Sequence, residues 1–141
     1  MKAMDLSQLK NTSDEQFNKD VTFDLLIPDG GNDHLQLTIK SVRNPAVKTQ
    51  FTKLVNSVTK ETAKLDKPNV TDAQAEVVNT KVAELETAIC KLIFVKFSGL
   101  TDGDKPLASS DANKEMLVSN YEWIRKAIVE KAASSEAFYQ A

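Results

Sequence analysis

The chain of 141 residues contains few side chains that can carry out enzyme chemistry. It has one histidine, His34, and one cysteine, Cys90. A Ser–His or Cys–His nucleophilic pair would have to form around that single histidine, which lies at the edge of a predicted turn. A structural zinc site needs several Cys and His ligands, and one of each is too few. We therefore predict that the protein is not an enzyme and uses no metal or other cofactor.

Cys90 and two aspartates have ordinary structural interpretations. Cys90 lies in the most apolar part of the sequence, and because apolar burial raises the pKa of a thiol, we interpret it as a core residue. Asp102 and Asp104 lie in a loop, but that loop lacks the regular oxygen spacing and the terminal Glu of a calcium-binding hand. We interpret the loop as a turn.

Two groups of residues suit protein binding. Trp123 falls one residue off the apolar stripe of its predicted helix, beside Tyr121. Large aromatic residues are enriched at interface hot spots, and packing in the core is the alternative role for this tryptophan. Several lysines lie on another predicted helix, on the side opposite to its apolar residues. They form either a solvated face or a docking face for an acidic partner. These lysines are Lys53, Lys60 and Lys64.

The distribution of charge and of apolar residues restricts the class of partner. Residues 1–39 carry three lysines and seven acidic residues, whereas residues 40–67 carry seven basic and two acidic residues. The net charge of −2 argues against nucleic acid as the main partner, because phosphate binding needs a basic footprint.

The longest apolar run, Leu92–Val95, is far too short to cross a bilayer. With no secretory signal after Met1, the cytoplasm is the expected location.

One long helix is predicted at the centre of the chain, from Thr71 to Phe97. Thr71 followed by Gln74 forms a capping box, which marks a helix start. Apolar residues then recur at three- and four-residue spacing, and the apolar stripe widens from Ala88 onward until it covers nearly the whole circumference. Such a helix must be covered by other elements, so we expect the domain to be organised around it.

The elements before this helix are a β-hairpin and a second helix. Residues 21–27 and 35–40 alternate apolar and polar side chains, and a Pro-Asp-Gly-Gly turn lies between them. A lone hairpin is marginally stable in water, so its apolar face must pack on a helix or on another subunit. Asn44 and Pro45 mark the start of a helix that ends at Lys67 and folds back antiparallel onto the central helix.

The elements after the central helix are a loop and two short helices. Gly99 ends the long helix, and the loop from Leu100 to Leu107 has a turn-forming middle that contains Gly103 and Pro106. Ser110 caps a helix that runs to about Ser119. A last helix follows over Tyr121–Ala133. The apolar ends of the loop suit binding of an amphipathic partner helix, with Trp123 beside them.

These elements predict a mainly α fold, an antiparallel helical domain around one long central helix with a small N-terminal β-hairpin. We expect a single domain over residues 1–141. Its parts are a mobile arm (residues 1–20), the hairpin (21–42), a helical body (45–133) and a tail that frays outward (134–141). The free edges of the hairpin also predict self-association.

The residues from Phe97 onward resemble the C-terminal part of the tail assembly chaperones of lambda-like siphophages. In that family an apolar helix ends in an aromatic residue, and a Gly-Leu-x-Asp-x-Gly-x-Pro-Leu type of loop, a Ser-capped helix and a last helix follow. The matching residues are Phe97, Gly99, Leu100, Asp102, Gly103, Pro106, Leu107, Ser110, Trp123, Ile124, Ile128 and Phe138. The turn of the hairpin is similar as well, through Ile27, Pro28, Gly30 and Gly31.

The resemblance implies a binding function and no enzymatic activity. Members of this family bind the long, helical tape measure protein, keep it soluble and assist polymerisation of the tail tube around it. They act in the cytoplasm of the host bacterium and are absent from the mature virion. Many are also made in a longer, frameshifted form, through which contact with the tail tube protein is expected. The predicted binding residues are Leu100, Gly103, Pro106, Leu107, Tyr121 and Trp123, with Lys53, Lys60 and Lys64 as a second surface.

A second hypothesis is a structural phage component, such as a head–tail connector or a tail completion protein, or another helical adaptor of similar shape. Such a component stays in the assembled particle, whereas a chaperone leaves it. Proteomics of purified particles separates the two hypotheses.

Overall fold

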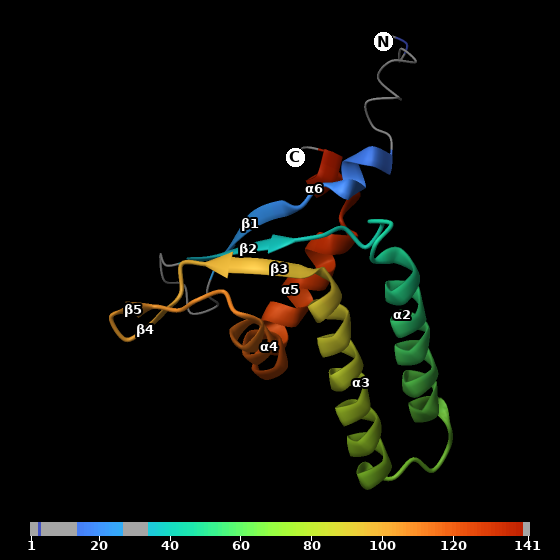
Figure 1. The fold of residues 1–141 in the computed structure, drawn as a ribbon. Helices are drawn as coiled ribbons and strands as arrows, with labels where there is room; N and C mark the ends of the chain where they lie inside the picture. The colour runs from blue at the N-terminus through green and yellow to red at the C-terminus, as the bar shows by residue number, and fades with distance from the viewer. Residues whose placement is uncertain (1–2, 4–13, 27–33, 140–141) are drawn as a thin grey trace.

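A three-stranded antiparallel sheet in the order β1-β2-β3 lies at the centre of the molecule (Figure 1). The computed structural model describes residues 3, 14–26 and 34–139. The elements in chain order are η1 (Asp14–Asn18), β1 (Val21–Leu26), β2 (His34–Ile39), α2 (Lys48–Ala63), η2 (Lys64–Asp66), α3 (Asp72–Ile93), β3 (Phe94–Ser98), β4 (Thr101–Asp102), β5 (Lys105–Pro106), α4 (Asp111–Asn120), α5 (Glu122–Ala133) and α6 (Ser135–Tyr139).

The predicted hairpin is confirmed in β1 and β2, which pair from Val21 opposite Ile39 to Leu26 opposite His34. Its turn, with Pro28, Gly30 and Gly31, and the side chain of His34 lie outside the described residues. The alternating sequence gives the sheet one apolar face, where Leu35, Leu37 and Ile39 of β2 are buried. The other face carries mostly exposed polar side chains: Thr22, Asp24, Gln36, Lys96 and Ser98.

The central helix is shorter than predicted, because its last residues form a strand. The capping box of Thr71 and Gln74 is present, with Thr71 Oγ1 accepting from Gln74 N–H at 3.1 Å. The helix then ends at Ile93 instead of Phe97, and residues 94–98 form β3 beside β2, with Phe97 opposite Leu37. The hairpin therefore gains a third strand at its β2 edge, which the helical period did not predict.

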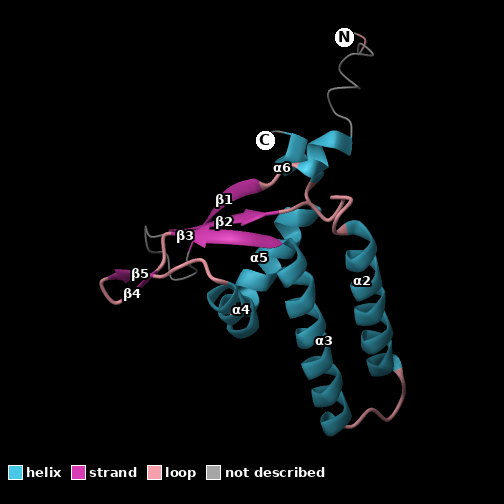
Figure 2. Ribbon diagram, in the orientation of Figure 1, coloured by secondary structure: helices cyan, strands magenta, loops and turns pink. Residues whose placement is uncertain are grey.

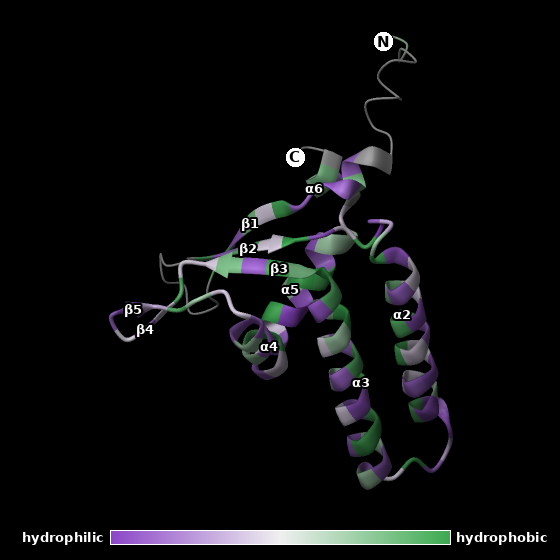
Figure 3. Ribbon diagram, in the orientation of Figure 1, coloured by the Kyte–Doolittle hydropathy of each residue, from purple (hydrophilic) through white to green (hydrophobic). Residues whose placement is uncertain are grey.

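The helices α2 and α3 form an antiparallel arm that extends away from the sheet (Figure 1). The predicted fold-back is confirmed, and Asn69, with φ at 66°, reverses the chain between the two helices. Helix α2 begins at Lys48 rather than at Pro45, after a turn in which Asn44 Oδ1 accepts from Ala46 N–H at 2.9 Å. None of the residues of α2 is fully buried. Figure 3 shows the polar surface of α2 and the apolar end of α3 near the sheet.

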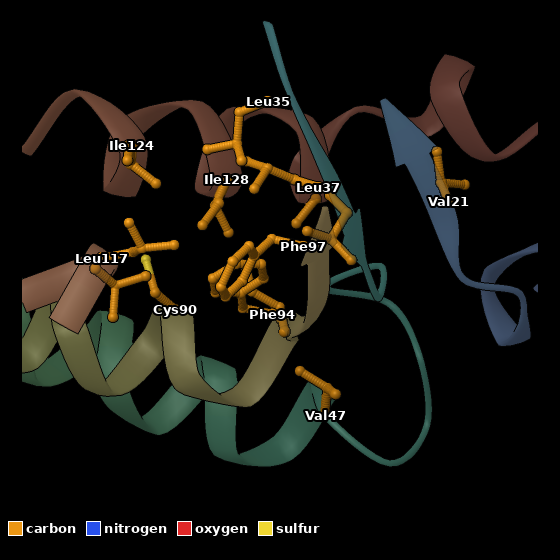
Figure 4. Close-up of a cluster of buried hydrophobic side chains, with 14 of the residues drawn as sticks. Val21, Leu35, Leu37, Val47, Cys90, Phe94, Phe97, Leu117, Ile124 and Ile128 are labelled. Carbon is orange, nitrogen blue, oxygen red and sulfur yellow. The ribbon is translucent and has the colours of Figure 1, made fainter. Parts of the chain in front are cut away.

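The core lies between the sheet and helices α3, α4 and α5 (Figures 2 and 4). Ile128 and Ile124 of α5 and Leu117 of α4 point toward Leu35 and Phe97 of the sheet (Figure 4). Cys90 is in the same cluster and is fully buried, as predicted. Helices α4 and α5 follow the predicted boundaries closely, and Ser110 Oγ caps α4 by accepting from Asn113 N–H at 3.2 Å.

The two described ends of the chain pack together instead of extending as an arm and a tail. Phe17 of η1 and Phe138 of α6 are both buried, and their ring centroids lie 6.1 Å apart. The guanidinium of Arg43 lies 5.0 Å from the centroid of the Phe17 ring, as a cation–π contact. The remainder of the predicted arm, residues 1–2 and 4–13, and of the tail, residues 140–141, lies outside the described residues.

The predicted fold class is wrong. The protein has a mixed α/β fold, because a three-stranded antiparallel sheet and the two-stranded β4–β5 hairpin accompany the helices. One source of the error is the strand formed by residues 94–98 at the end of the long apolar stretch. The other is the β4–β5 pairing within the predicted loop. Among the described helices, none has the length and apolar character needed to span a membrane.

Candidate partner-binding groove

A hollow of about 560 Å³ lies where the ends of β2 and β3 meet α4 and α5. We call it the α4–α5 groove. Its volume is in the range of protein ligand sites, and most of its lining is apolar. The residues that line it are Leu35, Gly99, Leu100, Thr101, Asp102, Leu107, Asn113, Met116, Leu117, Tyr121, Trp123 and Ile124.

The floor of the groove is part of the hydrophobic core. Leu35, Leu117 and Ile124 are buried, with 5%, 3% and 3% of their surfaces exposed. Since they belong to three different elements that are packed together, the floor is held rigidly. A partner that enters the groove meets a preformed apolar surface, which lowers the entropic cost of binding.

The loop on one side of the groove is closed by a short hydrogen bond. Leu107 N–H donates to Leu100 O at 2.8 Å, so the two leucines lie at the base of the β4–β5 hairpin. Gly99 has φ at 87°, in the left-handed region, and this allows the sharp turn after β3. Asn113 Nδ2 donates to Ala108 O at 2.8 Å and ties the loop to α4. Leu100 and Leu107 are therefore held as half-buried apolar anchors.

The turn between α4 and α5 forms another part of the lining of the groove. Tyr121 is 44% exposed at this turn, and the half-buried Trp123 lies in the first turn of α5. Arg125 fixes the turn from within, because its Nη1 donates to Val118 O at 2.8 Å and to Ser119 O at 3.1 Å. These bonds satisfy carbonyl groups at the C-terminal end of α4 that have no partner within the helix. The two aromatic side chains consequently have a rigid support.

The structure brings together four of the predicted binding residues and separates the others. Leu100, Leu107, Tyr121 and Trp123 all line the groove. Gly103, with φ at 64°, and Pro106 are exposed in the β4–β5 hairpin and shape the loop without lining the hollow. The predicted lysine row lies outside the groove. Lys53 and Lys60 are exposed on α2, and Lys64 is exposed at the start of η2, where its Nζ pairs with Glu61 at 3.0 Å.

Sequence reasoning missed Met116, Asn113 and Leu35 as groove residues. Met116 is three residues after Asn113 on α4, so both lie on one face of that helix. This spacing is visible in the sequence, but which face of α4 meets the loop depends on tertiary packing. A methionine in a binding surface adapts to irregular apolar partners because its side chain is flexible and polarisable.

The lining of the groove is chemically suited to contact with an apolar surface. Among the residues that line the groove, Asp102 is the only Asp, Glu, Lys, Arg or His. In the part of the chain that the structure describes, no three His, Cys, Asp or Glu side chains are grouped as metal ligands. Comparisons with known protein families, with curated proteins and with solved structures found no match.

Proposed function

We propose that this protein is a phage tail assembly chaperone that binds an amphipathic helix of the tape measure protein in the α4–α5 groove. The observation that carries the proposal is the lining of the groove, which combines buried apolar residues of the core with two leucines of the loop after β3 and two aromatic residues at the turn between α4 and α5. An amphipathic helix presents apolar side chains at three- and four-residue spacing, which suits such a groove.

The resemblance to tail assembly chaperones supports the identity of the partner. The residues that carry the resemblance include Leu100, Leu107 and Trp123, and these three line the same hollow. A long helical protein that awaits assembly exposes apolar stripes, and covering those stripes keeps it soluble. The proposal places this activity in the host cytoplasm, with self-association of the chaperone and contact with the tail tube protein through a longer form.

The test compares two exposed apolar residues on different surfaces. Tyr121 at the groove and Val55 on α2 are 44% and 37% exposed, so an aspartate at either site disturbs folding to a similar, small extent. We expect Tyr121→Asp to reduce the amount of co-expressed tape measure protein recovered in soluble form and Val55→Asp to leave it unchanged. Both variants should keep the helical circular dichroism of the parent chain.

Equal recovery with both variants would contradict binding in the groove. Trp123 provides a second, direct readout, because it is the only tryptophan in the chain and lines the groove. Its fluorescence should shift when a helical peptide of the tape measure protein is added. Proteomics of purified particles tests the wider proposal, since a chaperone should be missing from them and a structural component present.

A further inference from the structure

We propose that two copies of this chain associate through the arm of α2 and α3, with the α3 helices of the two copies packed antiparallel about a two-fold axis. The contact surface is the α3 face, which consists of Val77, Lys81, Glu84 and Ala88. This surface lies apart from the α4–α5 groove, and the proposal does not rest on binding of the tape measure protein. It rests on an exposed apolar side chain, on hollows beside the helix and on the placement of opposite charges.

The α3 face has the spacing of a helix surface that packs against another helix. Its residues follow one another at intervals of four, three and four positions, so they form one stripe along α3. The buried residues of α3 lie outside this stripe. Val77 is 70% exposed, more than any other large apolar side chain that the structure describes. Figure 1 shows that this part of α3 extends away from the sheet, with α2 beside it.

Two hollows lie along this side of α3, and they share Thr80 and Glu84 as lining residues. The first has a volume of about 520 Å³ and is lined in part by Val77. The second has a volume of about 550 Å³ and lies between α3 and α4, where Ala88 and Ser119 line it. Most of its lining residues are alanine, serine or threonine, so another helix can approach closely. The second hollow therefore has room for Val77 of a second copy.

The charges of the α3 face select an antiparallel pair. Lys81 and Glu84 are both exposed, and within the described part of the chain neither has an ion-pair partner. With the two-fold axis midway between them, Lys81 faces Glu84 of the second copy, and Glu84 faces Lys81. In the same register Val77 faces Ala88 at each end of the contact. A parallel pair would instead place lysine against lysine and glutamate against glutamate, which is destabilising.

Charge reversal at the two exposed positions tests the pairing. In Lys81→Glu both positions are glutamate, and in Glu84→Lys both are lysine. Each variant alone meets only like charges across the axis, so its dissociation constant should rise about tenfold or more above that of the parent chain. An equimolar mixture of the two variants restores both attractive contacts and should dimerise as the parent chain does. Sedimentation equilibrium from micromolar to near-millimolar concentration measures each sample.

A second pair of variants tests the apolar contact. Val77→Ser removes apolar surface from the α3 face, whereas Val55→Ser makes the same change on α2, where Val55 is 37% exposed. We expect Val77→Ser to weaken dimerisation several-fold, because less apolar surface is buried in the pair. Val55→Ser should leave dimerisation unchanged, and both variants should keep the circular dichroism of the parent chain.

Three results would overturn the proposal. The first is a parent chain that is monomeric at every concentration, which is also the result expected if the α3 face binds a different protein. The second is a mixture of Lys81→Glu and Glu84→Lys that associates no better than either variant alone. The third is equal weakening by Val77→Ser and Val55→Ser. None of these results bears on the α4–α5 groove, which is tested separately with the tape measure protein.

Discussion

Cys90 illustrates how packing sets the chemistry of a single side chain. Its thiol is fully buried, and Sγ lies 3.7 Å from Arg125 O of α5. Burial raises the pKa of this thiol from 9.0 to about 12; the positive charge of Arg125 lowers the pKa and the negative charge of Glu86 raises it further. The thiolate, which is the reactive form, is therefore suppressed in the folded protein.

The raised pKa of Cys90 predicts a pH dependence of stability. Because the unfolded thiol ionises near pH 9 and the folded thiol near pH 12, its contribution to stability is complete below pH 9 and is lost as the pH rises toward 12. Between pH 8 and pH 10 the parent chain should lose about 1 kcal/mol of unfolding free energy relative to Cys90→Ala. Urea unfolding of both chains at the two pH values measures this difference. An unchanged difference would mean that the thiol ionises equally in both states.

The sequence predicts the role of a residue well where that role depends on contacts with residues nearby in the chain. Thr71 and Gln74 are three residues apart, so their capping box depends only on the start of one helix. Trp123 was ambiguous between core and interface, since its environment depends on how α4, α5 and the loop after β3 pack together. The structure places it half-buried in the groove, between the two predicted roles.

At the scale of elements, the strand β3 shows the limit of periodicity. Leu92–Val95 is a continuous apolar run, and such a run fits a buried helix and a buried strand equally well. The deciding factor is tertiary. β2 has a second edge whose backbone groups are not bonded to β1, and residues 94–98 pair with that edge. Lys40 N–H also donates to Ile93 O at 2.8 Å where the helix ends.

At the outer edge of β3, Phe97 N–H donates to Ser109 Oγ at 2.9 Å. This hydrogen bond gives a prediction about the stability of the strand. Ser109→Ala removes the acceptor of Phe97 N–H and should lower the unfolding free energy by about 1–2 kcal/mol, because it leaves a partly buried donor without a partner. Hydrogen exchange of the Phe97 amide should become faster at the same time. Ser98→Ala is the matched control, since Ser98 Oγ contacts Gln36 Oε1 at 3.3 Å on the exposed face of the same strand pair. An equal effect of both variants would show that Ser109 does not protect the edge.

At the scale of the whole molecule, the fold has a well-packed body and a less buried arm. The body holds the sheet, α4, α5 and the end of α3, and it contains most of the buried apolar residues. The arm of α2 and the first part of α3 contributes Val78 to the buried residues, and α2 contributes none within Lys48–Ala63. The groove is built on the body, and no residue of α2 or α3 lines it.

Two contacts between distant parts of the sequence hold this body together. Val42 N–H, just after β2, donates to Ala132 O at the end of α5 at 3.1 Å. The second contact is the packing of Phe17 against Phe138. Sequence reasoning treated both of these aromatic residues as parts of a mobile arm or of a fraying tail, because short polar segments at the ends of a chain carry no periodicity. Only the tertiary structure shows that each ring covers the other.

The contact between Phe17 and Phe138 predicts that residues near both ends of the described chain stabilise the whole domain. Phe138 is completely buried, so Phe138→Ala should lower the unfolding free energy by about 3–5 kcal/mol, through lost burial and a residual cavity. Tyr121→Ala is the control, because this aromatic residue is 44% exposed and should cost about 1 kcal/mol or less. Urea unfolding followed by circular dichroism measures both changes. If Phe138→Ala unfolds at the same urea concentration as the control, residues 135–139 are not part of the cooperative core.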